Sequence, residues 1–182
     1  MGRCEPFESG VEVRGDVVDA VLRAAGELST AYQSRMEAAL AEEGIDDPRP
    51  DEWYSQRAYL HALDAIVQSA GPQVVTTVGE QIPRNVDWPR EVATAEDGLG
   101  LLNETYQDSH RGGDVGYYDF EQVAASAGRV FCKNPYPCAL DRGVVAGVAE
   151  WYGENETTVS VTESGETCRT EGDAECVYRV SW

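Results

Sequence analysis

The feature that most constrains the fold is a set of four cysteines in the last third of the chain. They stand in two pairs, Cys132 with Cys138 and Cys168 with Cys176. Each pair brackets a turn, one rich in proline and the other containing a Gly-Asp dipeptide. Turns bring thiolates together, and a tetrahedral metal ion needs four ligands, so the pattern predicts a zinc site formed by these four cysteines. The chain must then fold so that two distant turns meet.

Other uses of these cysteines stay open. The intervals within the pairs are wider than the roughly two to four residues usual in zinc ribbons. Four cysteines also hold iron–sulfur clusters. They can instead form disulfides or redox thiols, although a cytoplasmic protein disfavours disulfides, or pack as inert buried side chains. If a metal is bound by four protein ligands, no position is left for water, so we expect a structural rather than a catalytic metal.

Hydrophobic spacing divides the chain into a helical front and a mixed rear. Apolar residues recur every three or four positions in the front, whereas the rear alternates short strand patterns with one helical pattern. The expected helices are 16–43 (bent or split at Gly26), 51–69, 72–82, one capped by Thr94 and Asp97, and 140–152; the expected strands are 117–131 (with a turn at 127–128), 157–162 and 176–182. This order predicts an α+β fold, with N-terminal helices followed by a mixed or antiparallel sheet crossed by one helix.

We expect one compact domain with three parts. Residues 1–13 are predicted to be an irregular arm, 14–110 the helical part, and 111–182 the α/β part that carries the metal site. An apolar stripe over 17–40 predicts either a homodimer surface or packing within the chain.

Charge excludes several classes of partner. The chain has 33 acidic and 14 basic residues, a net charge of −19, and Lys133 as its only lysine. Nucleic acids and anionic membranes require a positive surface, so we expect neither as a partner. The acidity suits a cation sink or a basic partner, but with almost no lysine it is more typical of a halophile's hydrated surface.

No apolar run reaches the roughly 18–20 residues of a membrane span, and no signal-peptide stretch opens the chain, so we expect a soluble cytoplasmic protein.

From Cys138 onward the chain resembles the four-vinyl-reductase domain family. That family includes the sensory domains of phenol-responsive bacterial regulators and stand-alone archaeal proteins. The shared pattern is a cysteine that opens a helix, followed by Gly143 and Gly147, and then by Cys168 and Cys176 around a Gly-Asp turn. The strong part of the resemblance covers about 132–182.

The resemblance implies three of the metal ligands. In the phenol sensors, cysteines equivalent to Cys138, Cys168 and Cys176 bind zinc, and a glutamate three residues before the middle cysteine is the fourth ligand. This chain has Gly165 at that place. We therefore expect Cys132 to complete a four-thiolate site, with Glu163 or Glu166 as the alternative fourth ligand.

The resemblance also implies a ligand pocket between the helices and the sheet. In the phenol sensors, an aromatic residue about 20 positions before the first zinc cysteine lines such a pocket. Tyr117 and Tyr118 stand at that distance here, with His110 and Phe120 close in sequence. We expect these four residues to bind a small hydrophobic or aromatic ligand. The alternative is that the tyrosines are ordinary strand and core residues.

No catalytic signature accompanies these features. No Ser-His-Asp or Cys-His set and no nucleotide fingerprint is visible, so we expect no enzyme activity. The four-vinyl-reductase family is similar in fold to the heme nitric-oxide-binding domain, which carries a Tyr-x-Ser-x-Arg motif. Tyr106, Ser109 and Arg111 miss that spacing by one position, and we interpret the likeness as coincidence.

These observations favour a zinc-stabilised sensor domain that binds a small molecule. Its output would pass through a separate protein or through self-association, because the chain carries no DNA-binding segment or ATPase motor. Two alternatives remain: a structural dimer that holds zinc but no ligand, and an iron–sulfur or redox sensor that uses the same cysteines.

Overall fold

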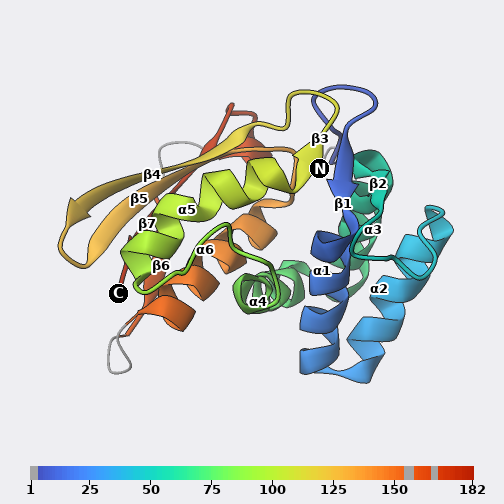
Figure 1. Cartoon of the computed structure of the whole chain (residues 1–182), viewed down its shortest axis with the longest axis horizontal. Helices are drawn as coiled ribbons and strands as arrows, with labels where there is room; N and C mark the ends of the chain where they lie inside the picture. Colours follow the sequence, from blue (N-terminus) through green and yellow to red (C-terminus); the bar gives the residue numbers. More distant parts are fainter. Residues whose placement is uncertain (1–3, 154–157, 165–167) are drawn as a thin grey trace.

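The computed structural model describes residues 4–153, 158–164 and 168–182. A four-stranded sheet with helices packed on it forms one side of the molecule, and further helices with a small sheet form the other (Figure 1). The helices are α1 (Gly15–Leu28), α2 (Thr30–Glu42), α3 (Gln56–Ala70), α4 (Pro72–Gln81), α5 (Ala95–Asp108) and α6 (Cys138–Tyr152), with 3-10 turns η1 (Ile82–Arg84) and η2 (Arg169–Glu171). The strands are β1 (Glu12–Arg14), β2 (Trp53–Ser55), β3 (His110–Arg111), β4 (Tyr117–Ala124), β5 (Ala127–Lys133), β6 (Ser160–Glu163) and β7 (Cys176–Ser181). The predicted α+β class is confirmed.

The long helix expected at the front is two helices, α1 and α2. The break is at Ser29 rather than Gly26, because the Ser29 side chain accepts a hydrogen bond from the backbone N–H of Tyr32 and caps α2. The two helices fold against each other and bury most of the predicted apolar stripe. Val21 and Met36, for example, are almost fully buried within the chain. Most of that stripe is therefore interior and not a free surface.

A small sheet, which the sequence did not predict, ties the N-terminal arm to the helices. Its order is β2-β1-β3, and both pairings are antiparallel. The expectation of an irregular arm is wrong at β1, where Val13 is fully buried and pairs with both Tyr54 and His110. Three-residue strands carry too little alternation to be seen in a sequence. The sheet places His110 in a strand, β3.

The larger sheet has the order β4-β5-β7-β6, and every neighbouring pair is antiparallel. Helices α5 and α6 cover one face of it (Figure 1). Tyr118 pairs with Cys132, and Cys132 pairs with Cys176. Directly paired residues point to the same side of a sheet, so these three side chains form a row across β4, β5 and β7. All three are buried, so the row faces the helices.

Helix α6 packs against α4 with almost no space between the two backbones. A Cβ atom at Gly143 would lie 2.1 Å from the carbonyl oxygen of Thr76, and one at Gly147 would lie 2.3 Å from that of Glu80. Residues four apart share one face of a helix, so both glycines face α4. The two glycines of the sequence pattern are thus explained by close helix packing.

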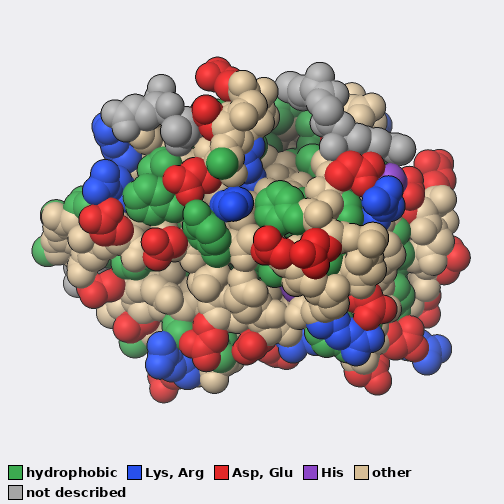
Figure 2. Space-filling model, turned by 90° about the horizontal axis from the view of Figure 1, so that it is seen from above, with side chains coloured by type: hydrophobic (Ala, Val, Ile, Leu, Met, Phe, Trp, Pro, Cys, Tyr) green, Lys and Arg blue, Asp and Glu red, His purple; other side chains and the backbone are tan. Residues whose placement is uncertain are grey.

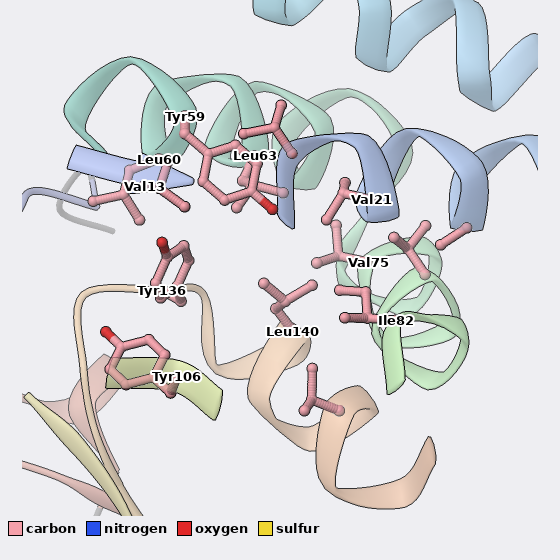
Figure 3. Packing of buried hydrophobic residues seen from close by; sticks show 14 of the residues in the cluster. Val13, Val21, Tyr59, Leu60, Leu63, Val75, Ile82, Tyr106, Tyr136 and Leu140 are labelled. Atoms are coloured by element: carbon pink, nitrogen blue, oxygen red, sulfur yellow. The ribbon is translucent and has the colours of Figure 1, made fainter. Parts of the chain in front are cut away.

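The core continues from the front helices to the sheet through aromatic contacts. Figure 3 shows Tyr136 between Tyr59 and Tyr106. Its ring centroid is 5.8 Å from that of Tyr59 and 6.1 Å from that of Tyr106, both edge to face. The turn that carries Tyr136 therefore joins α3 to α5, next to the beginning of α6.

The surface agrees with the composition. On the face shown in Figure 2, acidic side chains are spread widely among fewer basic ones. None of the helices in the described residues is long and apolar enough to cross a membrane.

Candidate metal centre and ligand cavity

Three of the four paired cysteines meet at the beginning of α6. The Sγ atoms of Cys138, Cys168 and Cys176 all lie within 4.8 Å of one another. The Cys138–Cys176 distance is 3.3 Å, and the Cys168–Cys176 distance is 3.9 Å. Tetrahedral zinc with bonds of about 2.3 Å places sulfur ligands about 3.8 Å apart. This cysteine cluster could therefore hold a metal ion.

The predicted fourth ligand is placed differently. Within the described residues, Cys132 does not join the cysteine cluster: it lies fully buried on β5, opposite Cys176, and burial raises the pKa of its thiol. Glu163 Oε1 lies 4.0 Å from Cys168 Sγ, at the edge of contact. Gly165 and Glu166 lie outside the described residues. The structure thus brings one of the two alternative carboxylates to the cluster.

Hydrogen bonds distribute the charge within the cysteine cluster. Contact between the two sulfurs lowers the pKa of Cys176 and raises that of Cys138, because one proton can be shared between them. The backbone N–H of Arg169 donates to Cys176 Sγ at 3.3 Å, and its guanidinium lies 3.8 Å from Cys138 Sγ. Such donors favour a thiolate, which is the form of cysteine that binds metals.

A buried ion pair adjoins the cysteine cluster. Asp141 is fully buried on α6 and pairs with the guanidinium of Arg169. Its Oδ1 also accepts hydrogen bonds from the Tyr118 hydroxyl at 2.5 Å and from the Asn134 amide at 3.1 Å. Burial raises the pKa of Asp141, and these partners oppose that shift. Sequence reasoning missed this pair; the available signal was an acid, Asp141, among the apolar residues that begin the helix.

A cavity of about 80 Å³ lies between the helices and the sheet. Its walls come from α1, α3, η1 and the loop that follows it, α5, β3, β4, α6 and the turn after β5. Five of the lining side chains are aromatic: Tyr59, Trp88, Tyr106, Tyr118 and Tyr136. Most of the others are aliphatic, so the cavity suits an apolar occupant.

The polar groups of the cavity are few and defined. His110 is buried, with Nδ1 2.7 Å from the Tyr106 carbonyl oxygen and Nε2 2.6 Å from the Tyr136 hydroxyl. Burial lowers the pKa of His110 to about 4, although the bond to Tyr106 opposes this. The ring is therefore neutral at pH 7. A carbonyl oxygen only accepts, so Nδ1 donates to Tyr106, and Nε2 accepts from Tyr136.

Gln56 is a further polar group near this site. Its side chain is fully buried close to Tyr136. Neither of its polar atoms makes a hydrogen bond of normal geometry within the part of the chain that the structure describes, although its contact with Tyr136 opposes the rise that burial causes in the pKa of that tyrosine. An unsatisfied buried amide costs about 1–3 kcal/mol.

Two of the four predicted ligand-binding residues line the cavity. His110 and Tyr118 do, whereas Tyr117 and Phe120 do not. Tyr117 points to the opposite face of β4, as strand alternation requires, and its exposed hydroxyl donates to Glu175. Phe120 packs against Trp182 with their ring centroids 6.2 Å apart. Sequence reasoning missed Tyr59, Tyr106 and Tyr136, because they come from distant helices and a turn.

Comparison with known proteins identifies the fold. No family model matches the chain, and no curated protein matches its sequence. An H-NOX protein from S. oneidensis in an Fe(II)NO state aligns with a TM-score of 0.68 and 11% identity, over 92% of this chain and 98% of that one. The chain has the H-NOX fold.

Two further H-NOX structures agree. An oxygen-binding H-NOX domain related to soluble guanylate cyclases gives a TM-score of 0.63 at 16% identity, over 92% of this chain and 94% of that chain. A mutant H-NOX from T. tengcongensis gives 0.62 at 14% identity, over 92% and 96%. The distant fold similarity expected from the sequence resemblance is therefore found. Identities this low establish the fold alone.

The residues present do not fit a heme. A cavity of about 80 Å³ is far smaller than the roughly 300–1,000 Å³ of sites for larger ligands and cofactors. The one histidine among the described lining residues has both ring nitrogens engaged, and none of those residues is basic to pair with heme carboxylates. The near-match motif is dispersed: Tyr106 and Ser109 bond to backbone carbonyls, while Arg111 is exposed and pairs with Glu12.

Proposed function

We propose that this protein is a non-catalytic sensor domain of the four-vinyl-reductase kind, stabilised by zinc, that binds a small apolar or aromatic ligand. The observation that carries the proposal is the aromatic-lined cavity with one buried polar pair, His110 and Tyr136. Parts 14–110 and 111–182 work as one domain in this proposal, because the cavity takes its walls from both.

The chemistry of the cavity supports a ligand about the size of one aromatic ring. Dry apolar cavities of roughly 150 Å³ bind benzene, so the cavity of about 80 Å³ would have to widen by movement of its lining side chains to hold one ring. A hydroxyl on the ring can exchange hydrogen bonds with His110 and Tyr136. It would also offer a partner to the unsatisfied amide of Gln56, which lies close to Tyr136.

The donor set supports zinc at the cysteine cluster. An iron–sulfur cluster with all-cysteine ligation needs four thiolates, and three gather here. Zinc accepts mixed sulfur and carboxylate ligands, so Glu163 or Glu166 would complete a site of three cysteines and one glutamate. A shift of the Cys132 side chain, one strand away on β5, would instead complete the four-thiolate site.

The setting of the domain belongs to the same proposal. The acidic surface suits the salt-rich cytoplasm of a halophile, where carboxylates keep protein surfaces hydrated. The signal would pass to a separate output protein or through a homodimer.

The first experiment is elemental analysis and an absorbance spectrum of protein purified in high salt. About one zinc per chain with no visible band is the expected result for a structural site. Iron with visible absorbance would overturn zinc and favour the iron–sulfur or redox alternative. Protein without metal would favour inert thiols or disulfides.

The second experiment measures binding of phenol and benzene by calorimetry. Both are expected to bind, and phenol more tightly, because only phenol has a hydroxyl for His110 and Tyr136. Leu140→Trp fills the cavity and is expected to abolish binding, whereas Val123→Trp, at an exposed position on β4, is the matched control. No binding by wild type would favour the structural-dimer alternative, which light scattering then tests.

A further inference from the structure

The cavity and the cysteine cluster are connected through one side chain, that of Arg169. Its guanidinium pairs with the Asp141 carboxylate and donates to the Tyr136 carbonyl oxygen at 3.1 Å. It also donates to Asn134 Oδ1 at 2.7 Å. These partners lie on α6 and on the turn between β5 and α6. Arg169 therefore links η2 to two other elements.

On the cavity side, the connection runs through two tyrosines. The Tyr118 hydroxyl donates to Asp141 Oδ1 at 2.5 Å, while the Arg169 guanidinium contacts Oδ2 of the same carboxylate. Tyr136 accepts from Arg169 with its backbone oxygen and bonds to His110 with its hydroxyl. Both tyrosines line the cavity. An occupant that moves either one therefore acts on the partners of Arg169.

Arg169 also adjoins all three residues of the cysteine cluster. It follows Cys168 in the chain, its backbone N–H donates to Cys176 Sγ at 3.3 Å, and its guanidinium lies 3.8 Å from Cys138 Sγ. Cys138 and Asp141 lie one turn apart on α6 and move together with that helix. The position of the guanidinium thus sets the separation of η2 from α6.

Burial makes these contacts interdependent. Asp141 is fully buried, and the side chain of Arg169 is only 13% exposed. Breaking the ion pair would leave a buried charge without a partner, which is strongly destabilising, so the members of the network rearrange together.

We propose that Arg169 is a positioning residue that couples the cavity to the metal site, through Asp141 and Tyr118 on one side and through the cysteine cluster on the other. The inference rests on the proposed function for the existence of the metal site. Coupling of two sites is reciprocal, so zinc binding changes the affinity of the cavity by the same factor as cavity binding changes the affinity for zinc.

The test compares the zinc affinity of the wild type, Tyr118→Phe and Tyr106→Phe, measured by competition with a chromophoric chelator. Tyr118→Phe removes one hydroxyl that contacts Asp141. Tyr106→Phe is the matched control, because it also lines the cavity but its hydroxyl donates to the Val115 carbonyl oxygen. We expect zinc affinity to fall about tenfold in Tyr118→Phe, in the range typical of residues that orient metal ligands, and to stay at the wild-type value in Tyr106→Phe.

Cobalt substitution supplies a readout that overall stability does not move. The visible bands of Co²⁺ bound to thiolates report ligand geometry, and we expect them to shift in Tyr118→Phe but not in Tyr106→Phe. Asp141→Asn, which keeps the shape of the side chain, is the second variant and should weaken zinc about 10- to 100-fold. Arg169→Lys should lose affinity comparably, because lysine lacks the guanidinium fork.

The outcomes separate the two proposals. Equal zinc affinity and equal cobalt spectra in Tyr118→Phe and Tyr106→Phe would overturn the coupling while leaving the zinc site intact. Wild-type protein that binds neither Zn²⁺ nor Co²⁺ would overturn the proposed metal site and the coupling with it. Failure to bind phenol, with zinc affinity still sensitive to Tyr118, would remove the ligand but keep the connection.

Discussion

The cysteine cluster and the cavity lie side by side but are built in opposite ways. The cluster takes its side chains from the first residue of α6, the residue before η2 and the first residue of β7. A few hydrogen bonds position the thiols there. The cavity takes its walls from residues between 17 and 144, and none of them alone defines it. The difference teaches that a cluster of possible metal ligands can be predicted from local spacing, whereas an apolar cavity is a property of the whole packing arrangement.

The largest expected effect is a loss of stability when the cysteine cluster can no longer bind a metal. Cys138→Ser or zinc removal should destabilise the region around α6 and β7 by several kcal/mol, because metal binding energy is folding energy in a structural site. Thermal unfolding with and without chelator measures this. Cys4→Ser, outside the cluster, is the control and should respond to chelator as wild type does. Unchanged stability in Cys138→Ser would end the structural-metal interpretation.

The next effect lies where the two regions join. Arg169→Ala leaves the Asp141 carboxylate buried without its cation and should cost about 3–5 kcal/mol. The exposed Arg23–Asp19 pair offers a comparison, since Arg23→Ala should cost at most about 1 kcal/mol. Urea unfolding of both variants checks this order. Equal losses would show that the buried pair has no special role.

Acid should lower the stability of the fold through His110, the histidine that lines the cavity. His110 binds a proton in the unfolded chain near pH 6.5 but only at about pH 4 when folded. The unfolded state therefore holds more protons between these values, so stability is full above pH 6.5 and falls by about 3 kcal/mol as pH drops to 4. His110→Gln should flatten this part of the pH–stability curve. An NMR titration of wild type that places the His110 pKa near 6.5 would contradict the prediction.

The smallest effect is the loss of stability expected from a substitution on α6, the helix that contributes to both the cluster and the cavity. Gly143→Ala places a Cβ atom against the Thr76 carbonyl oxygen and should cost about 1–3 kcal/mol by forcing α4 and α6 apart. Gly100→Ala is the matched control, because no atom lies within 4 Å of its added Cβ. That substitution should stabilise α5 by up to about 1 kcal/mol. Thermal melts of both variants should therefore shift in opposite directions.

Much of the fold could be predicted from spacing. The helices at 72–81 and 138–152 and the last strand were placed to within a few residues, and Thr94 caps α5 as expected. The turn between β4 and β5 lies at 125–126 instead of 127–128. Gly128 is paired on both sides within β5, with Gln122 of β4 and Val180 of β7, and its missing side chain leaves room for the Phe120 ring. The arm strand β1 was missed because its three residues pair only with distant segments.

By itself, the sequence determined the helical front, the mixed rear and the turns that carry Cys138, Cys168 and Cys176, since period, capping and turn chemistry act over a few neighbouring residues. Tertiary structure alone decided which tyrosines line the cavity, that Cys132 lies on the neighbouring strand, and that Asp141 pairs with Arg169. Those outcomes depend on desolvation and close packing between segments far apart in the chain. Such terms exist only after the helices and the sheet have come together.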